Sequence, residues 1–248
     1  MSLNLILPFF STAVMLVFTI WVLQKFATRR KAHFLFWGLG LAMFGTASFA
    51  EAFLALNWNR WVFFSWYLFG AALNAGWIGH GTLYLLVRKK WVHVITGILI
   101  VGSVIATWMM LQVMPLLDEG VFTTALPVSE QYAEIMPAVS EGASVRLTTP
   151  FFNIYGLITL VGGALYSSFL FWRKRVMPNR VIGNVLIAAG ALFIGLASSL
   201  TRFGEGSYLY IGELVAAVLM FSGFMLAGKP AADRGKVPAT VASESAAD

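Results

Sequence analysis

The stretch VHVITGILIVGSVIATWMMLQVM (residues 92–114) contains no lysine, arginine, aspartate or glutamate. A helix rises about 1.5 Å per residue, so a run of this length crosses the roughly 30 Å hydrocarbon core of a bilayer. A strand of a membrane barrel would be about ten residues long with alternating polarity, and this run has neither property. The stretch therefore predicts a membrane-spanning helix.

Similar apolar runs occur along the whole chain. Hydrophobic residues make up 59% of the sequence and charged residues 11%, whereas a soluble domain carries about 25% charged residues. We therefore expect an all-α, polytopic membrane protein whose residues 1–228 form a seven-helix bundle in a plasma membrane of the bacterial inner-membrane type. The seven runs are residues 4–24, 33–56, 61–87, 92–114, 151–172, 181–200 and 207–227.

The basic residues alternate between the two sides of this predicted bundle. Of the 17 lysines and arginines, 14 fall in the first, third and fifth connections and the C-terminal tail. The second, fourth and sixth connections hold Arg60, Arg146 and Arg202 together with most of the acidic residues. Because cytoplasmic loops are enriched in basic residues, we expect the N-terminus outside and the C-terminus in the cytoplasm. The net charge of +6 then suits an anionic membrane surface, so no nucleic-acid partner is expected.

Two segments are predicted to lie outside the bilayer. The outer connection, residues 115–150, contains Ser129 before an acidic turn and Pro137 eight residues later, which predicts a short helix capped by Ser129 and ended by Pro137. We interpret this connection as a solvated spacer rather than a lid. Residues 229–248 are rich in Ala, Pro and Ser without apolar periodicity, and we expect a disordered cytoplasmic tail.

Polar residues near the outer ends of several runs form the main candidate site. Counting along each helix places Glu51 and Glu213 about a turn and a half below the outer surface, where they could face one cavity. Two nearby carboxyl groups would suit cation binding or proton-linked sensing. The alternative is that Arg202 pairs with Glu213 or Glu205 and only holds helices together. The predicted ligand-binding layer consists of Glu51, Asn153, Tyr155, Arg202, Tyr208, Tyr210 and Glu213.

The stretch ALNAGWIGHGTLYLL (residues 72–86) supplies the secondary candidates Asn74, His80 and Tyr84. Depth counting separates His80 from the outer carboxyl groups, and no second buried histidine is available as a haem partner. We therefore expect His80 to hydrogen-bond a neighbouring helix that the flanking glycines allow to come close. The chain has no cysteine, no clustered metal ligands and no lysine within a run, so no metal, haem, retinal or other cofactor is expected.

A family resemblance rests on LFWGLGLAMFGTASFAEAFLAL and WYLFGAALNAGWIGHGTLYLLV. An early tryptophan, the acidic Glu51, the aromatic–glycine pair in WYLFG and the basic RKK boundary resemble the N-terminal seven-helix sensor region of bacterial histidine kinases. The resemblance covers about a fifth of the chain and implies a receptor-like role. Those sensors pass their signal to a cytoplasmic output domain, whereas this sequence continues only into the tail, so a separate signalling partner at the cytoplasmic loops would be needed.

These observations favour a binding protein over an enzyme. The chain lacks G-x-S-x-G and H-x-x-E-H motifs and has no aspartate within a run. We expect a receptor-like or accessory protein that binds a small ligand, lipid or partner helix in an outer-half pocket. The alternatives are a membrane enzyme or transporter component that acts on a lipid or polyisoprenoid, and a structural subunit of a larger membrane complex.

Overall fold

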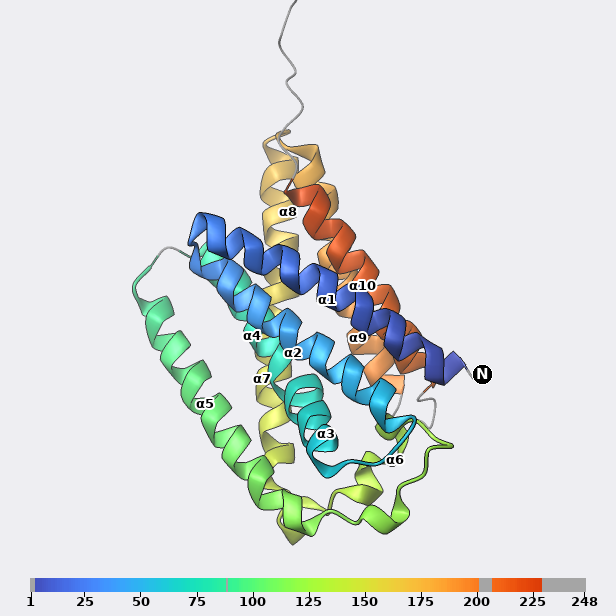
Figure 1. The fold of residues 1–248 in the computed structure, drawn as a ribbon. Helices are drawn as coiled ribbons and strands as arrows, with labels where there is room; N and C mark the ends of the chain where they lie inside the picture. The colour runs from blue at the N-terminus through green and yellow to red at the C-terminus, as the bar shows by residue number, and fades with distance from the viewer. Residues whose placement is uncertain (1–2, 88, 201–206, 229–248) are drawn as a thin grey trace, which may run out of the picture.

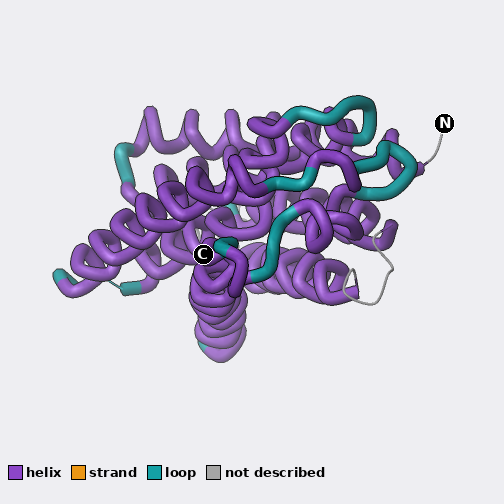
Figure 2. The backbone as a smooth tube through the Cα atoms, turned by 90° about the horizontal axis from the view of Figure 1, so that it is seen from below, coloured by secondary structure: helices purple, strands orange, loops and turns teal. Residues whose placement is uncertain are grey.

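The computed structural model describes residues 3–87, 89–200 and 207–228, and this part of the chain is helical without any strand (Figure 2). The predicted tail and Arg202 lie outside the described residues. The long helices and the segments that extend them are α1 (Leu3–Arg29), α2 (Ala32–Leu54), α3 (Arg60–Ser65), η1 (Trp66–Leu73), α4 (Asn74–Leu86), α5 (Trp91–Val113), α7 (Thr148–Leu157), η6 (Ile158–Gly162), α8 (Gly163–Arg173), α9 (Pro178–Leu200) and α10 (Ser207–Ala227). The connection after α5 contains η2 (Met114–Leu116), η3 (Glu119–Val121), α6 (Val128–Ile135), η4 (Val139–Glu141) and η5 (Ser144–Leu147).

Six helices of the described part are long and apolar enough to cross a membrane, which makes the chain a multi-pass membrane protein. They are Ile6–Arg29, Ala32–Leu54, Trp91–Leu116, Ser144–Arg173, Pro178–Ser198 and Tyr208–Ala227. The prediction is thus confirmed for six of the seven runs. The third run forms helix continuously from Arg60 to Leu86 through α3, η1 and α4. It is not among the six, and its Asn74, His80, tyrosines and glycines make it more polar than the others.

The long helices form a bundle around α2 and α4 (Figure 1). Helix α1 packs along α2, and α10 lies between α1 and α9. Helix α4 contacts α2 on one side and α7 and η6 on the other. Helix α5 stands at the edge of the bundle and buries the smallest share of its length among the six, as expected for a helix facing lipid. The N-terminal end of α1 and the short helix α6 lie at the same end of the molecule (Figure 1).

The connection between α5 and α7 packs on the bundle and is not the solvated spacer that the sequence predicted. Val128, Ile135, Met136 and Val145 are almost fully buried and belong to a core cluster that also contains Phe63 of α3. Burying an apolar side chain of this size contributes about 1.5–3 kcal/mol, so this contact holds the connection on the end of the bundle.

The prediction that Ser129 caps a helix is wrong. Helix α6 begins at Val128 after Pro127, so Ser129 lies inside its first turn and its buried hydroxyl has no hydrogen-bond partner among the described residues. The helix does end two residues before Pro137, as the sequence indicated. The start differs because Pro127 already provides the fixed extended backbone that a helix entry needs.

Candidate functional site

A pair of glutamates lies at the end of the bundle that the sequence predicts to face the outside. Glu51 of α2 is 2% exposed and Glu213 of α10 is 7% exposed. Their carboxyl groups are within hydrogen-bonding reach of each other, although 161 residues separate them along the chain. The indole N–H of Trp66 donates to Glu51 Oε1 at 2.8 Å, and the Ser48 hydroxyl donates to Glu213 Oε2 at 3.4 Å. The structure thus joins the two residues that depth counting placed in one layer.

Tyr210 completes the surroundings of this carboxyl pair. It lies about one turn before Glu213 on α10, is 2% exposed and reaches the backbone of Val128 at the start of α6. The start of α6 therefore lies against Tyr210, beside the carboxyl pair. Tyr208 is 52% exposed, so it is not part of this buried site. The prediction for Arg202 lies outside the described residues.

Asn153 and Tyr155 contact other parts of the bundle. The Asn153 side-chain amide donates to the carbonyl oxygen of Ala71 in η1 at 3.0 Å. The Tyr155 hydroxyl lies 2.6 Å from His80 Nδ1. Depth counting put both residues in the layer of Glu51 and Glu213, but depth does not say which way a side chain points around its helix.

His80 lies at the centre of a hydrogen-bonded chain that links three helices. It is fully buried, and its Nε2 lies 2.9 Å from Thr96 Oγ1 on α5 while its Nδ1 bonds Tyr155 on α7. Thr96 Oγ1 lies 3.1 Å from the Tyr84 hydroxyl, which lies 2.7 Å from His93 Nδ1. The expectation that His80 joins neighbouring helices is confirmed.

The glycines beside His80 allow this close approach. A Cβ on Gly79 would lie 2.9 Å from both the Cα and the carbonyl oxygen of Gly156, so α4 and α7 meet backbone to backbone. A Cβ on Gly81 would overlap the indole of Trp37 on α2. Asn74 is half-buried at the start of α4, where its carbonyl oxygen faces Gly40 of α2. This arrangement fits an interhelical junction.

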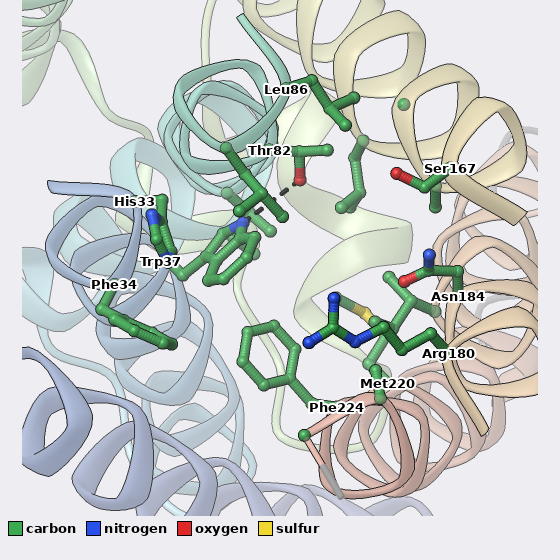
Figure 3. Close-up of a pocket in the computed structure, with 18 of the residues that line it drawn as sticks. His33, Phe34, Trp37, Thr82, Leu86, Ser167, Arg180, Asn184, Met220 and Phe224 are labelled. Atoms are coloured by element: carbon green, nitrogen blue, oxygen red, sulfur yellow. Dashed lines mark hydrogen bonds between the residues drawn. The ribbon is translucent and has the colours of Figure 1, made fainter. Parts of the chain in front are cut away.

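A cavity of about 470 Å³ opens at the opposite, basic end of the bundle. Its rim carries four cationic side chains, Lys25, Arg29, Lys31 and Arg180, and no acidic side chain is among the described residues that line it. Figure 3 shows Arg180 extending into the cavity beside Asn184, with Trp37 and Phe224 across from it. The deeper wall is apolar and includes Phe18, Leu41, Ile78, Leu160, Ile187 and Met220.

Several contacts fix the shape of this cavity. The Trp37 indole N–H donates to Thr82 Oγ1 at 3.2 Å, and its ring meets Phe224 edge to face at 4.7 Å (Figure 3). The ammonium of Lys25 sits 3.3 Å from the centre of the Trp21 ring. Aromatic side chains from α1, α2 and α10, namely Phe18, Trp37 and Phe224, thus form part of the cavity wall.

Of the predicted site residues that the structure describes, none lines this cavity. Its cations were interpreted from the sequence as topology signals, because each cluster stands at the inner end of a run. The available signal was that the first and fifth connections are both strongly basic. Only the fold shows that Lys31, just before α2, and Arg180 of α9 line the same cavity.

The described residues contain no group of three or more histidines, aspartates or glutamates that could hold a metal ion. No family model, curated protein or solved structure matches this chain.

Proposed function

We propose that this chain is a receptor-like or accessory membrane protein that binds an anionic amphiphile, such as a phospholipid, in the cavity at its basic end. The observation that carries the proposal is the pairing of a cationic rim with an apolar wall in one cavity of about 470 Å³. Ligand cavities are typically about 300–1,000 Å³ and combine mostly apolar walls with a few polar groups.

The chemistry of the rim selects the headgroup. Guanidinium and ammonium groups bind phosphate and carboxylate oxygens, and arginine can do so with two parallel hydrogen bonds. Arg180 reaches into the cavity, and Asn184 beside it offers both a donor and an acceptor (Figure 3). A small soluble anion would leave the wall formed by Phe18, Leu160 and Ile187 unused, whereas an acyl or isoprenoid chain would cover it.

The proposal includes seven membrane crossings with the N-terminus outside and the C-terminus in the cytoplasm. The third crossing is the helix from Arg60 to Leu86. In this orientation the cationic rim lies at the cytoplasmic leaflet, where anionic phospholipids create a negative surface potential. The sequence suggested a ligand site in the outer half of the bundle, whereas we now propose one at the inner end. The resemblance to kinase sensor regions stays a prediction, and a bound lipid would be the signal that such a receptor passes to a partner.

Native mass spectrometry of the purified protein tests this function. We expect the protein to retain one anionic phospholipid in preference to a zwitterionic lipid with the same chains. Arg180→Gln removes a solvent-exposed charge, so we expect a loss of about 1–2 kcal/mol, or five- to thirtyfold in affinity. Lys90→Gln is the matched control, because Lys90 is exposed and belongs to a predicted cytoplasmic connection but does not line the cavity.

A second variant tests the apolar part of the cavity. The Ser167 side chain projects into it (Figure 3), so Ser167→Phe would fill the space for a chain and leave the four cations in place. We expect this variant, like Arg180→Gln, to retain less of the anionic phospholipid than the wild type. Equal retention of anionic and zwitterionic lipid by the wild type and both variants would overturn the proposal.

A further inference from the structure

The carboxyl pair of Glu51 and Glu213 has no part in the proposed lipid cavity, because neither residue lines it. Both glutamate side chains are more than nine-tenths buried. One oxygen of each has a hydrogen-bond donor, because Trp66 donates to Glu51 and Ser48 donates to Glu213. What remains is Glu51 Oε2, which is buried and has no hydrogen-bond donor among the described residues.

The neighbouring Glu213 carboxyl group faces Glu51 but cannot supply a donor while it is ionised. An ionised carboxylate only accepts hydrogen bonds, whereas a protonated one donates through its O–H. Two ionised carboxylates in contact would also repel each other in surroundings that exclude water. A single proton between the two groups removes the repulsion and gives Glu51 Oε2 its missing donor.

The other groups facing the pair are neutral or acidic. Helix α10 contributes Tyr210, which in turn lies near the acidic Glu130 of α6. Arg60, at the start of α3, pairs instead with Glu119 through a contact of 2.6 Å between its Nε and Oε1. In the ranges that the structure describes, no lysine or arginine neutralises the pair. Arg202 and Glu205 precede α10 in the chain and lie outside those ranges.

Helix α1 brings a further polar group to the same level. Met15 of α1 packs against Gly45 of α2, and the two helices run antiparallel. Ser11 lies one turn before Met15 and Ser48 about one turn after Gly45, so the two serines are at the same depth. The Ser11 hydroxyl is fully buried and has no partner among the described residues. Buried polar atoms without partners cost free energy, and this level of the bundle contains two of them, Ser11 Oγ and Glu51 Oε2.

We propose that Glu51 and Glu213 form a proton-binding site in which one proton is shared between the two carboxyl groups and joins α2 to α10 beneath α6. The site holds one net negative charge when the proton is bound. Loss of the proton leaves two negative charges side by side, which separates the two helices. This inference is independent of the lipid cavity at the other end of the bundle.

Labelling with dicyclohexylcarbodiimide tests the proposal, because this apolar reagent reacts with protonated carboxyl groups inside membranes. We expect one adduct per folded chain, mapped by peptide mass spectrometry to Glu51 or Glu213, with a yield that falls as the pH rises. The double variant Glu51→Gln with Glu213→Gln should lose the adduct. Glu134→Gln, at an exposed position of α6, should keep it.

Two further experiments distinguish a shared proton from a bound sodium ion and from neutralisation by Arg202. A bound sodium ion would protect the pair, so labelling that drops in sodium but not in choline solution would overturn the proposal. If Arg202 neutralises the pair, the wild type would stay unlabelled while Arg202→Gln would become labelled, which would also overturn it. We expect the Glu→Gln variants to fold, because Gln has nearly the same size as Glu and also forms hydrogen bonds. A cooperative thermal unfolding transition in detergent verifies that each variant is folded.

Discussion

Gly79→Ala probes the contact that positions His80. The added Cβ would lie 2.9 Å from the Cα and carbonyl oxygen of Gly156, and closer still to Thr159 Oγ1, whereas an ordinary contact is about 3.4–4 Å. Because two of these atoms belong to the backbone of α7, the helices must move apart by about half an ångström or more. Overpacking of this kind costs about 1–3 kcal/mol, and replacing glycine in a helix returns about 0.5–1 kcal/mol.

The expected net loss is therefore up to about 2.5 kcal/mol, which corresponds to a fall in melting temperature of at most roughly 10 °C for a chain of this size. Gly97→Ala is the matched control, because a Cβ at this position in α5 meets no atom within 4 Å. It should leave stability unchanged or raise it by up to about 1 kcal/mol. Thermal unfolding in detergent, followed by tryptophan fluorescence, measures both. A Gly79→Ala protein as stable as Gly97→Ala would refute the close packing of α4 on α7.

Two other predictions concern the histidine junction and the topology. Tyr155→Phe removes the hydroxyl that bonds His80 at 2.6 Å, so we expect a loss of about 1 kcal/mol in the same unfolding assay, while Tyr166→Phe, at an exposed position of α8, should change nothing. Equal melting temperatures for these two variants would contradict a role for the Tyr155–His80 bond. Because the chain has no cysteine, single cysteines report sidedness directly. Ser140→Cys in the outer connection should react with an impermeant maleimide on intact cells and Thr28→Cys only after permeabilisation, and the reverse pattern would invert the proposed orientation.

The sequence was sufficient to predict the membrane-spanning helices because apolar length is a local property of the chain. Residues 92–114, for example, form helix over almost the predicted range. The third run is the exception, since Asn74 and His80 lower its hydropathy while the fold still makes it helical. The outer connection was misinterpreted because Ile135 and Met136 stand among charged residues, and only the fold shows that they pack against the bundle.

The candidate site was predicted only in part, for a geometric reason. Depth counting placed Glu51 and Glu213 at the same level, and the fold brings their side chains together although α2 and α10 each pack mainly on α1 and other helices. It assigned Tyr155 to the same layer, but the rotation of α7 directs that hydroxyl to His80. The cavity could not be found this way, since Lys31 and Arg180 are distant in sequence and line one cavity only through the packing of the helices.

The cavity is tested most directly by photo-crosslinking in membranes with an anionic phospholipid that carries a diazirine in its acyl chain. We expect crosslinks to apolar wall residues such as Leu160, Ile187 and Met220, and their loss in Ser167→Phe. Crosslinks confined to lipid-facing residues such as Val101 and Ile105 of α5, equal in the wild type and the variant, would contradict it.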